Sequence, residues 1–542
     1  MRRKTIILGW DGATFKILDK MVAKGVMPNL ERVIIYGTKS ELISTTPPIT
    51  GPAWTSFNTG KKPEDHGVFS FFKSPAESLD VEDVERHNAL SIDGLSYWNI
   101  LNHSGQKCIV VDFPLTDPVE EIDGVMISGM SSKGIRGALI SPEPVKGEIE
   151  KKFSNYFKKT ITDGLSVSES FLDHLIQLLE EKSELDLYLM RNKEWDLFST
   201  LFSAVDILQH YFWKYMDTSS VQYVKDIGIQ RKIDEFFKKL DEILGKYCEI
   251  LGSDGNLILV SDHGFGPRNY IFYVNNFLRK SGYLSLDNKN LTNARYKEII
   301  KRIINKSDIF ELKRLVKKEM REKINRSLQP LVKIKWEHSK AGFRLNNEYG
   351  VYINKKDKFP EGIVSEGEYK YILDDLINGF TNERNSFTGE KVFEKVLSGS
   401  AMYSGGKYSD DAPDIILIPL KGVTLVGFKY SDQNVMLEKN SSLLSGFHEP
   451  EGVFLGYGPG FEQGRVITAP LFIHDIAPLI LHLAEIEPLK YMKKNIAGEI
   501  LKNEDVRRKK VNSSEIKKRF AGVDDFNDTE TIEALRGLGY LD

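Results

Sequence analysis

The sequence has little cysteine and no excess of either charge. Only Cys108 and Cys248 occur among its 542 residues, which excludes a disulfide framework and a multi-cysteine zinc site. The 74 lysines and arginines nearly balance the 77 aspartates and glutamates, and the formal charge is −3. A chain balanced in this way has no overall field that would steer it to nucleic acid or to an anionic membrane. We therefore expect no nucleic-acid partner.

Long apolar runs are also missing. No segment approaches the ~20 apolar residues that a membrane-spanning helix needs. The first apolar run follows a basic start and stops at Asp11 after about six residues, whereas the apolar part of a signal peptide has about 7–15. We expect a cytoplasmic protein without a membrane anchor, and nothing in the sequence indicates its oligomeric state.

Short apolar runs alternate with amphipathic segments along the chain. The strand-like runs are 5–10, 107–112, 195–202, 257–261, 414–418 and 452–456, and the helix-like segments include 170–182 and 228–251. This alternation is typical of βαβ units with a mostly parallel sheet. Continuous apolar strands fit a sheet that is covered on both faces. We predict an α/β fold with three layers, helices on either side of the sheet.

At 542 residues the chain is too long for one compact core. Residues 289–335 contain fifteen Lys/Arg against five Asp/Glu, with apolar residues at helical spacing. The segment is either a helical insertion with a solvated basic face, or a lid or partner surface that attracts an anionic substrate. We expect core sheet over 1–285 and 413–502, an inserted helical and mixed lobe over 286–412, and a charged tail over 503–542 with a short helix near 530–540.

Acidic and histidine residues follow two of the predicted strands directly. Asp11 comes after the run 5–10, and Asp262 and His263 come after the run 257–261. Neighbouring side chains point apart unless the backbone turns sharply, and the glycine at 264 permits such a turn. An open α/β sheet gathers its ligands beyond the carboxyl ends of its strands. These three side chains are therefore expected to meet.

Three further ligand-type residues belong to the same pattern. Asp206 and His210 follow the run 195–202 and lie four residues apart, on one face of a helical turn. His448 lies on a glycine-bearing loop ahead of the run 452–456. Carboxylates and imidazoles bind borderline divalent metals readily. Three aspartates and three histidines suit two ions, an arrangement used for displacement at phosphorus.

A candidate nucleophile lies in the segment 45–60. Two prolines favour an extended entry, Thr50 stands near the N-cap of a predicted helix, Pro52 lies in the first turn, and Gly60 ends it. A hydroxyl there lies at the positive end of the helix, where free amides bind phosphate oxygens. From these residues alone, Thr50 is either a plain helix cap or a nucleophile activated by an adjacent metal.

The motifs together resemble the alkaline phosphatase superfamily, and within it the type I phosphodiesterase/nucleotide pyrophosphatase group. The resemblance rests on Asp11, the helix from Thr50 to Gly60 with its sequel Pro63-Glu64-Asp65-His66-Gly67, Asp206-x-x-x-His210, Asp262-His263-Gly264 and His448. The chain is similar to the phosphohydrolase/phosphomutase proteins predicted for the prokaryotic cytosol. The resemblance implies an alkaline-phosphatase-like three-layer α/β/α fold.

The resemblance also implies a role for each matched residue. One divalent ion would be held by Asp11, Thr50, Asp262 and His263, and the other by Asp206, His210 and His448. Zinc suits this set best, and manganese is the alternative. Thr50 would be the nucleophile and form a transient phosphothreonine. The implied activity is hydrolysis of a small phosphate ester, either a monoester or a diester.

The sequence departs from the group's pattern at one position. Nucleotide pyrophosphatases carry an asparagine three residues after the nucleophile, and here that residue is Ala53. This disfavours nucleotide diesters as substrates. The segment 50–54 also lacks the Cys or Ser nucleophile and the arginine of sulfatases. The alternatives left open are a phosphomutase with the same metal site, a non-catalytic binding protein on the same fold and, less favoured, a phospho-headgroup transferase.

Overall fold

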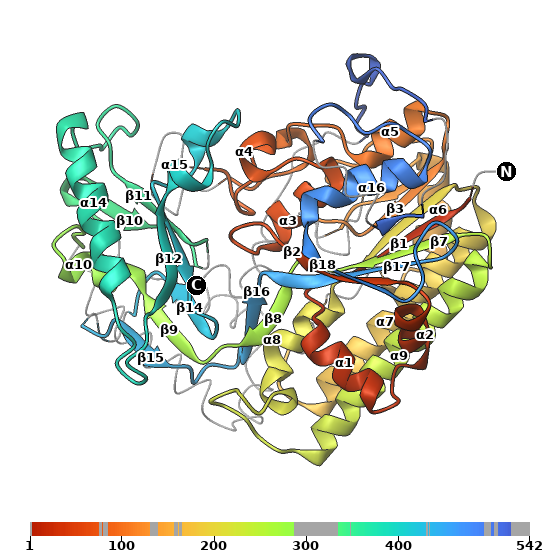
Figure 1. The fold of residues 1–542 in the computed structure, drawn as a ribbon, viewed down its shortest axis with the longest axis horizontal. Helices are drawn as coiled ribbons and strands as arrows, with labels where there is room; N and C mark the ends of the chain where they lie inside the picture. The colour runs from red at the N-terminus through yellow and green to blue at the C-terminus, as the bar shows by residue number, and fades with distance from the viewer. Residues whose placement is uncertain are drawn as a thin grey trace.

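The structure is a computed structural model, and its main body is a twisted sheet with helices on both faces, joined to a smaller lobe (Figure 1). It describes residues 3–74, 79, 85–129, 139–156, 161, 165–286, 334–346, 348–429, 432, 434–492, 500–502 and 508–521. Most of the basic segment 289–335, and the helix expected near 530–540, lie outside these residues. Among the described helices, none has the length and apolar character needed to span a bilayer.

The main sheet has the strand order β18-β2-β17-β7-β1-β6-β3-β4-β5. Its strands are β1 (Thr5–Trp10), β2 (Thr38–Ile43), β3 (Cys108–Val111), β4 (Gly124–Ile127), β5 (Ile140–Ser141), β6 (Leu197–Phe202), β7 (Asn256–Val260), β17 (Glu451–Tyr457) and β18 (Arg465–Phe472). All run in one direction except β17, which is antiparallel to β2 and β7, and β5, which is antiparallel to β4. The predicted mostly parallel sheet is confirmed.

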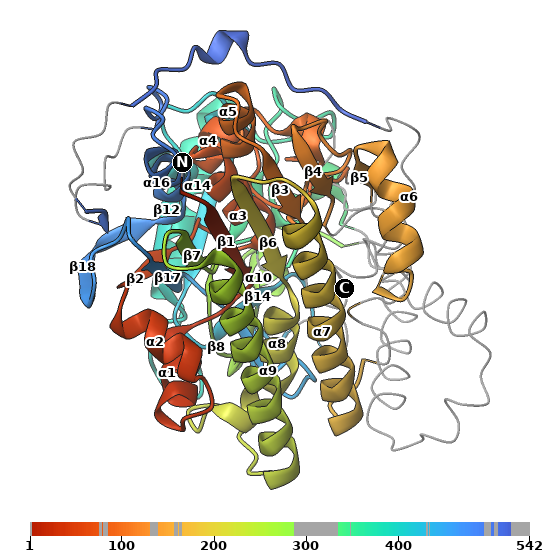
Figure 2. The ribbon, with the colours of Figure 1, turned by 90° about the vertical axis from the view of Figure 1, so that its right-hand side faces the viewer.

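Helices cover both faces of this sheet. One face packs against α1 (Phe15–Ala23), α2 (Pro28–Ile35), α7 (Glu169–Asn192), α8 (Ala204–Met216) and α9 (Ile227–Leu251), and the other against α3 (Thr50–Thr59), α5 (Tyr97–His103) and α16 (Ile476–Leu483). Figure 2 shows α7, α8 and α9 side by side over the first face. Strand β1 alternates as a pleated strand must, with Ile6 and Leu8 in the first core and Ile7 in the second. The predicted three layers are therefore present.

The smaller lobe has its own apolar core around two short sheets. One is β10 (Ala341–Phe343), β11 (Gly350–Ile353), β13 (Ile415–Pro419) and β12 (Phe393–Ser398), and the other is β14 (Val423–Val426), β9 (Tyr270–Tyr273) and β15 (Leu437–Lys439). Helices α10 (Val274–Lys280) and α14 (Glu366–Asn382) pack on this core. The lobe thus uses segments on both sides of the expected insertion.

The strand expected at 414–418 exists, but it belongs to the smaller lobe and not to the main sheet. Strand β13 pairs antiparallel with β11 and β12. An apolar run of this length is compatible with any buried strand, so its composition does not determine which sheet it joins. The main sheet resumes instead at β17, the strand expected at 452–456.

A two-stranded ribbon connects the sheet to the lobe. Strand β8 (Gly264–Pro267) pairs antiparallel with β16 (Gly446–Glu449). Strand β16 leads directly into β17, which runs against its neighbours. The beginning of β17 therefore lies at the same edge of the sheet as the carboxyl ends of β1, β6 and β7.

A buried polar network fixes α7 and α9 to strand β6. The Lys182 ammonium donates to Asp186 Oδ1 at 2.7 Å and to Thr200 Oγ1 at 2.6 Å. Asp186 Oδ2 accepts from Thr200 Oγ1 at 2.8 Å and from the Tyr247 hydroxyl at 2.7 Å. The carboxylate of Asp186 is fully buried, so these bonds replace the water it loses on folding. They also fix the position of β6, whose end leads into α8.

We expect Asp186→Ala to lower the free energy of unfolding by about 3 kcal/mol, because it leaves the buried Lys182 ammonium without its closest carboxylate. Asp112 lies 3.4 Å from the same ammonium and still compensates part of its charge. We therefore expect a loss at the lower end of the range of about 3–5 kcal/mol for breaking a buried ion pair. Denaturant unfolding followed by circular dichroism measures the change. Glu184→Ala, on the exposed side of the same helix, should change it by less than about 0.5 kcal/mol. Equal effects of the two variants would contradict this role of the network.

Candidate metal centre

The seven residues singled out in the sequence come together at the carboxyl edge of the main sheet. Asp11 follows β1, Asp262 and His263 follow β7, Asp206 and His210 lie in α8 just after β6, His448 lies in β16, and Thr50 begins α3. None of the seven is more than 6% exposed. The polar groups of distant segments are therefore buried together at one place.

The first cluster consists of Asp11, Asp262 and His263, whose ligand-type atoms lie within 4.8 Å of one another. His263 Nε2 lies 3.3 Å from Asp262 Oδ2 and 3.7 Å from Asp11 Oδ1. Thr50 Oγ1 is 3.2 Å from the same His263 nitrogen. The threonine hydroxyl is therefore in contact with this cluster.

The second cluster consists of Asp206, His210 and His448, again within 4.8 Å of one another. Asp206 Oδ2 lies 3.4 Å from His210 Nε2, and Asp206 Oδ1 lies 3.3 Å from His448 Nε2. The two Nε2 atoms are 3.1 Å apart. The second cluster adjoins the first, because the rings of His263 and His448 stack with centroids 3.8 Å apart.

Backbone carbonyl groups orient all three imidazole rings. The Nδ1 atoms of His210, His263 and His448 lie 3.2, 3.2 and 3.0 Å from the carbonyl oxygens of Gly446, Gly264 and Pro48. A carbonyl oxygen only accepts, so each Nδ1 carries the proton and each Nε2 lone pair is directed into the site. This is the arrangement in which histidines bind metals.

Burial keeps these histidines neutral. Loss of hydration lowers the pKa of His210 to about 3 and lowers the pKa of His263. It also lowers the pKa of His448 well below its usual value, with the other two imidazoles adding to the effect. Neutral imidazole is the form that donates a lone pair to a cation.

The carboxylates lack the charge compensation that buried anions need. Burial, and then the nearby Asp262 carboxylate, raise the pKa values of Asp11 and Asp206 well above their usual range. Within the described part of the chain, Asp11 Oδ1, Asp206 Oδ1 and Asp262 Oδ2 are buried without a hydrogen-bond partner. Native proteins leave few such atoms, and a divalent cation would satisfy them. The donor sets of both clusters therefore fit divalent metal ions.

Phe265 is a part of the site that the sequence analysis missed. Its ring centroid lies 4.8 Å from that of His210, 5.2 Å from that of His448 and 6.0 Å from that of His263. The ring thus limits how the imidazoles can tilt. No sequence signal marks this residue beyond its place one step after the Asp262-His263-Gly264 motif.

Gly12 is a second part of the site that the sequence analysis missed, although the sequence contains a pattern that predicts its role. Its φ is +69°, and an added Cβ would lie 2.8 Å from the Phe265 ring. Its amide donates to Asp262 Oδ1 at 3.1 Å and so holds that carboxylate in place. A glycine directly after Asp11, at the end of a strand, is the pattern expected for such a turn.

A serine–histidine contact elsewhere does not form a hydrolytic pair. Ser56 Oγ and His66 Nε2 are 2.9 Å apart, and both side chains are fully buried. His66 Nδ1 accepts from the amide of Val68 at 3.1 Å, so its proton resides on Nε2 and donates to the serine. A base for serine needs the opposite tautomer. His66, the last residue of the short helix α4 (Pro63–His66), therefore links α3 to the backbone at Val68.

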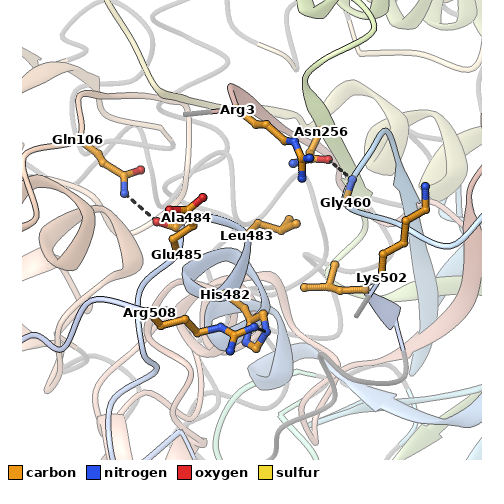
Figure 3. A pocket seen from close by; sticks show the side chains of 11 residues that line it. Arg3, Gln106, Asn256, Gly460, His482, Leu483, Ala484, Glu485, Lys502 and Arg508 are labelled. Atoms are coloured by element: carbon orange, nitrogen blue, oxygen red, sulfur yellow. Dashed lines mark hydrogen bonds between the residues drawn. The ribbon is translucent and has the colours of Figure 1, made fainter. Parts of the chain in front are cut away.

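A separate pocket opens at the opposite edge of the sheet (Figure 3). It is lined by Arg3 ahead of β1, Asn256 at the start of β7, and by His482, Lys502 and Arg508. Because β1 and β7 are parallel, their starts lie away from the clusters at their ends. The pocket contains none of the seven site residues.

Solved structures with the same fold share little sequence with the chain. Phosphonoacetate hydrolase from Sinorhizobium meliloti, in complex with phosphonoformate, has a TM-score of 0.52 and 15% identity over 88% of this chain and 94% of its own. Human ectonucleotide pyrophosphatase/phosphodiesterase 5 has a TM-score of 0.50 and 14% identity over 92% of this chain and all of its own. Its murine counterpart, inactive and in complex with AMP, has a TM-score of 0.51 and 13% identity over the same shares. At these identities the likeness shows the fold alone.

Curated protein sequences give no match. The family described as type I phosphodiesterase/nucleotide pyrophosphatase, in contrast, matches residues 5–448. The match begins with β1 and ends at His448, so it includes both clusters, Thr50 and most of the smaller lobe. The chain belongs to the type I phosphodiesterase/nucleotide pyrophosphatase family, within the alkaline phosphatase superfamily, and is a phosphoric ester hydrolase.

Proposed function

We propose that this hydrolase cleaves a phosphate monoester or diester through a phosphothreonine intermediate at Thr50, with two divalent ions held by the two clusters. The observation that carries the proposal is the position of Thr50 Oγ1, 3.2 Å from His263 Nε2. Because His263 Nδ1 bonds to a carbonyl, Nε2 accepts and the threonine hydroxyl donates. Two residues earlier, the carbonyl of Pro48 orients His448 of the second cluster.

The start of helix α3 supports a nucleophilic role for Thr50. Thr50 is the first residue of this helix, after Ile49 in extended conformation. The N–H groups of a first helical turn have no acceptor within the helix, and they carry the positive end of its dipole. The amides of Thr50 and Gly51 are thus placed to bind phosphoryl oxygens. Ala53, whose methyl group cannot donate a hydrogen bond, leaves the phosphoryl oxygens to these amides.

The proposed ions can be attributed to particular residues of this chain. Asp11, Thr50, Asp262 and His263 would hold one, and Asp206, His210 and His448 the other. When bound, the ions would lower the pKa of the threonine hydroxyl, neutralise the phosphoryl oxygens and stabilise the leaving oxygen. Zinc suits this mixture of carboxylate and imidazole best, and manganese is the alternative.

The reaction then needs two displacements at phosphorus. Thr50 Oγ1 attacks, a bond from Oγ1 to phosphorus forms, and the bond from phosphorus to the ester oxygen breaks. The hydroxyl proton is lost to solvent, and the displaced oxygen takes up a proton and leaves as an alcohol. Water next attacks the phosphothreonine, which releases the phosphate product and restores the hydroxyl.

The substrate class follows from the relatives and from position 53. One solved relative is a phosphonoacetate hydrolase bound to phosphonoformate, and another is in complex with AMP. We propose a small phosphate ester for this chain, too. Since Ala53 stands where nucleotide pyrophosphatases carry asparagine, an alcohol part other than a nucleoside is favoured.

Thr50→Ala should lower kcat for 4-nitrophenyl phosphate esters by about 10³-fold or more, because it removes the attacking oxygen. Nitrophenolate release in the presence of Zn²⁺ or Mn²⁺ measures the change. Thr55→Ala is the matched control. Its hydroxyl is equally buried but bonds within the helix to the Gly51 carbonyl at 2.8 Å. Unchanged turnover in Thr50→Ala would refute the nucleophile.

Asp262→Asn should lose one equivalent of bound metal, because the amide keeps an acceptor for Gly12 but removes one of the two carboxylates of the first cluster. Elemental analysis of the purified protein by plasma mass spectrometry measures the content. Asp196→Asn is the control. Asp196 accepts from the Lys107 amide at 2.8 Å, at the opposite edge of the sheet. Two equivalents retained in Asp262→Asn would exclude this residue as a ligand.

A further inference from the structure

A small pocket lies between the main body and the smaller lobe, beside the segment that leads to Thr50. Pro47 and Phe72 line it from the main body, and Arg344, Tyr352 and Tyr403 line it from the lobe. Pro47 precedes Thr50 by three residues, which limits the distance between their Cα atoms to about 11 Å. The pocket is therefore within reach of a small molecule that reacts at Thr50.

Contacts between the lobe and this segment fix the pocket in place. The Tyr403 hydroxyl donates to the carbonyl of Thr46. One residue beyond Pro47, the Pro48 carbonyl accepts from His448 Nδ1 at 3.0 Å. The wall of the pocket is thus continuous with the backbone that orients a residue of the second cluster.

Arg344 is the distinctive group in the pocket. It follows strand β10 and is only 8% exposed, and its Nε has no hydrogen-bond partner within the described part of the chain. Its guanidinium carbon lies 5.8 Å from the centroid of the Tyr352 ring, a cation–π contact that leaves its in-plane N–H groups available. A buried cation with an unsatisfied donor is costly, and a bound anion would satisfy it.

The other charged groups of the pocket leave it suited to an anion. Glu348 lines it as well and is close enough to Arg344 for an electrostatic effect, but no ion pair within 4.0 Å joins the two in the described residues. Burial raises the pKa of the Glu348 carboxyl, although Arg344 acts in the opposite direction. Lys73 adds a second cation at the rim, where it also pairs with Glu85 at 2.7 Å.

We propose that this pocket binds a second anionic group of the substrate, a carboxylate or phosphate on the part of the ester remote from the reacting phosphorus, and that Arg344 recognises it. The inference rests on the proposed function, since it places the reacting phosphorus at Thr50. A guanidinium binds such a group through two parallel N–H bonds, which gives orientation as well as affinity. Arg344 is thus a specificity-determining residue contributed by the smaller lobe.

The test compares two diesters that differ by one terminal carboxylate, ethyl 4-nitrophenyl phosphate and 2-carboxyethyl 4-nitrophenyl phosphate. The wild-type enzyme should show a KM about tenfold or more lower for the carboxyethyl ester, as expected for a charge-assisted hydrogen bond. Arg344→Met should abolish this preference and leave the ethyl ester unchanged. Arg344→Lys should keep part of the preference for the carboxyethyl ester. Arg384 is an exposed arginine of the same lobe, and Arg384→Met should keep all of the preference.

Two outcomes separate this inference from the proposed function. Turnover of both esters without a preference, or an equal loss for both in Arg344→Met, would overturn the anion site while leaving the hydrolase intact. If neither ester is turned over, the affinities of the two esters for Thr50→Ala are compared by calorimetry. Tighter binding of the carboxyethyl ester, lost on adding Arg344→Met, would uphold the anion site while the proposed function fails. Equal binding of the two esters would overturn the site.

Discussion

The register of three neighbouring parallel strands determines where the charged groups of this enzyme lie. Strand β1 pairs with β6 through Trp10 and Phe202, and with β7 through Gly9 and Val260. The strands thus end at the same level, and the chain that leaves each of them carries part of the ligand set. A shift of one residue would turn each affected side chain to the other face of the sheet. The register of these strands therefore determines which side chains meet at the carboxyl edge of the sheet.

The cost of this arrangement is electrostatic. Asp11, Asp206 and Asp262 are buried near one another, and burial raises the pKa of the first two, which opposes folding with all three ionised. The imidazoles do not offset these charges, because burial keeps them neutral. Divalent ions bound to the clusters would offset them, so we expect metal binding and stability to be coupled. The network around Lys182 and Asp186 of α7 bonds to Thr200 of β6, the strand that leads to Asp206, and holds this strand against the repulsion.

Much of the site could be predicted because its residues follow strands that are easy to recognise. Asp11 and Asp262 each come directly after a continuous apolar run, and Asp206 and His210 have helical spacing. His448 was expected in a loop but lies in β16, directly ahead of β17, and it reaches the site because β17 is antiparallel to its neighbours. An apolar run does not encode its direction or its sheet, which is also why the strand at 415–419 was expected in the main sheet. Phe265 and Arg344 act through three-dimensional contacts that leave no pattern in the sequence.

We propose that the two clusters each hold a divalent cation next to the Thr50 hydroxyl. Anomalous X-ray diffraction from crystals of the protein loaded with Zn²⁺ tests it most directly. We expect two strong anomalous peaks, one in contact with Asp11, Asp262 and His263 and one in contact with Asp206, His210 and His448. Zinc bound elsewhere in the protein, with both clusters free of anomalous signal, would contradict it.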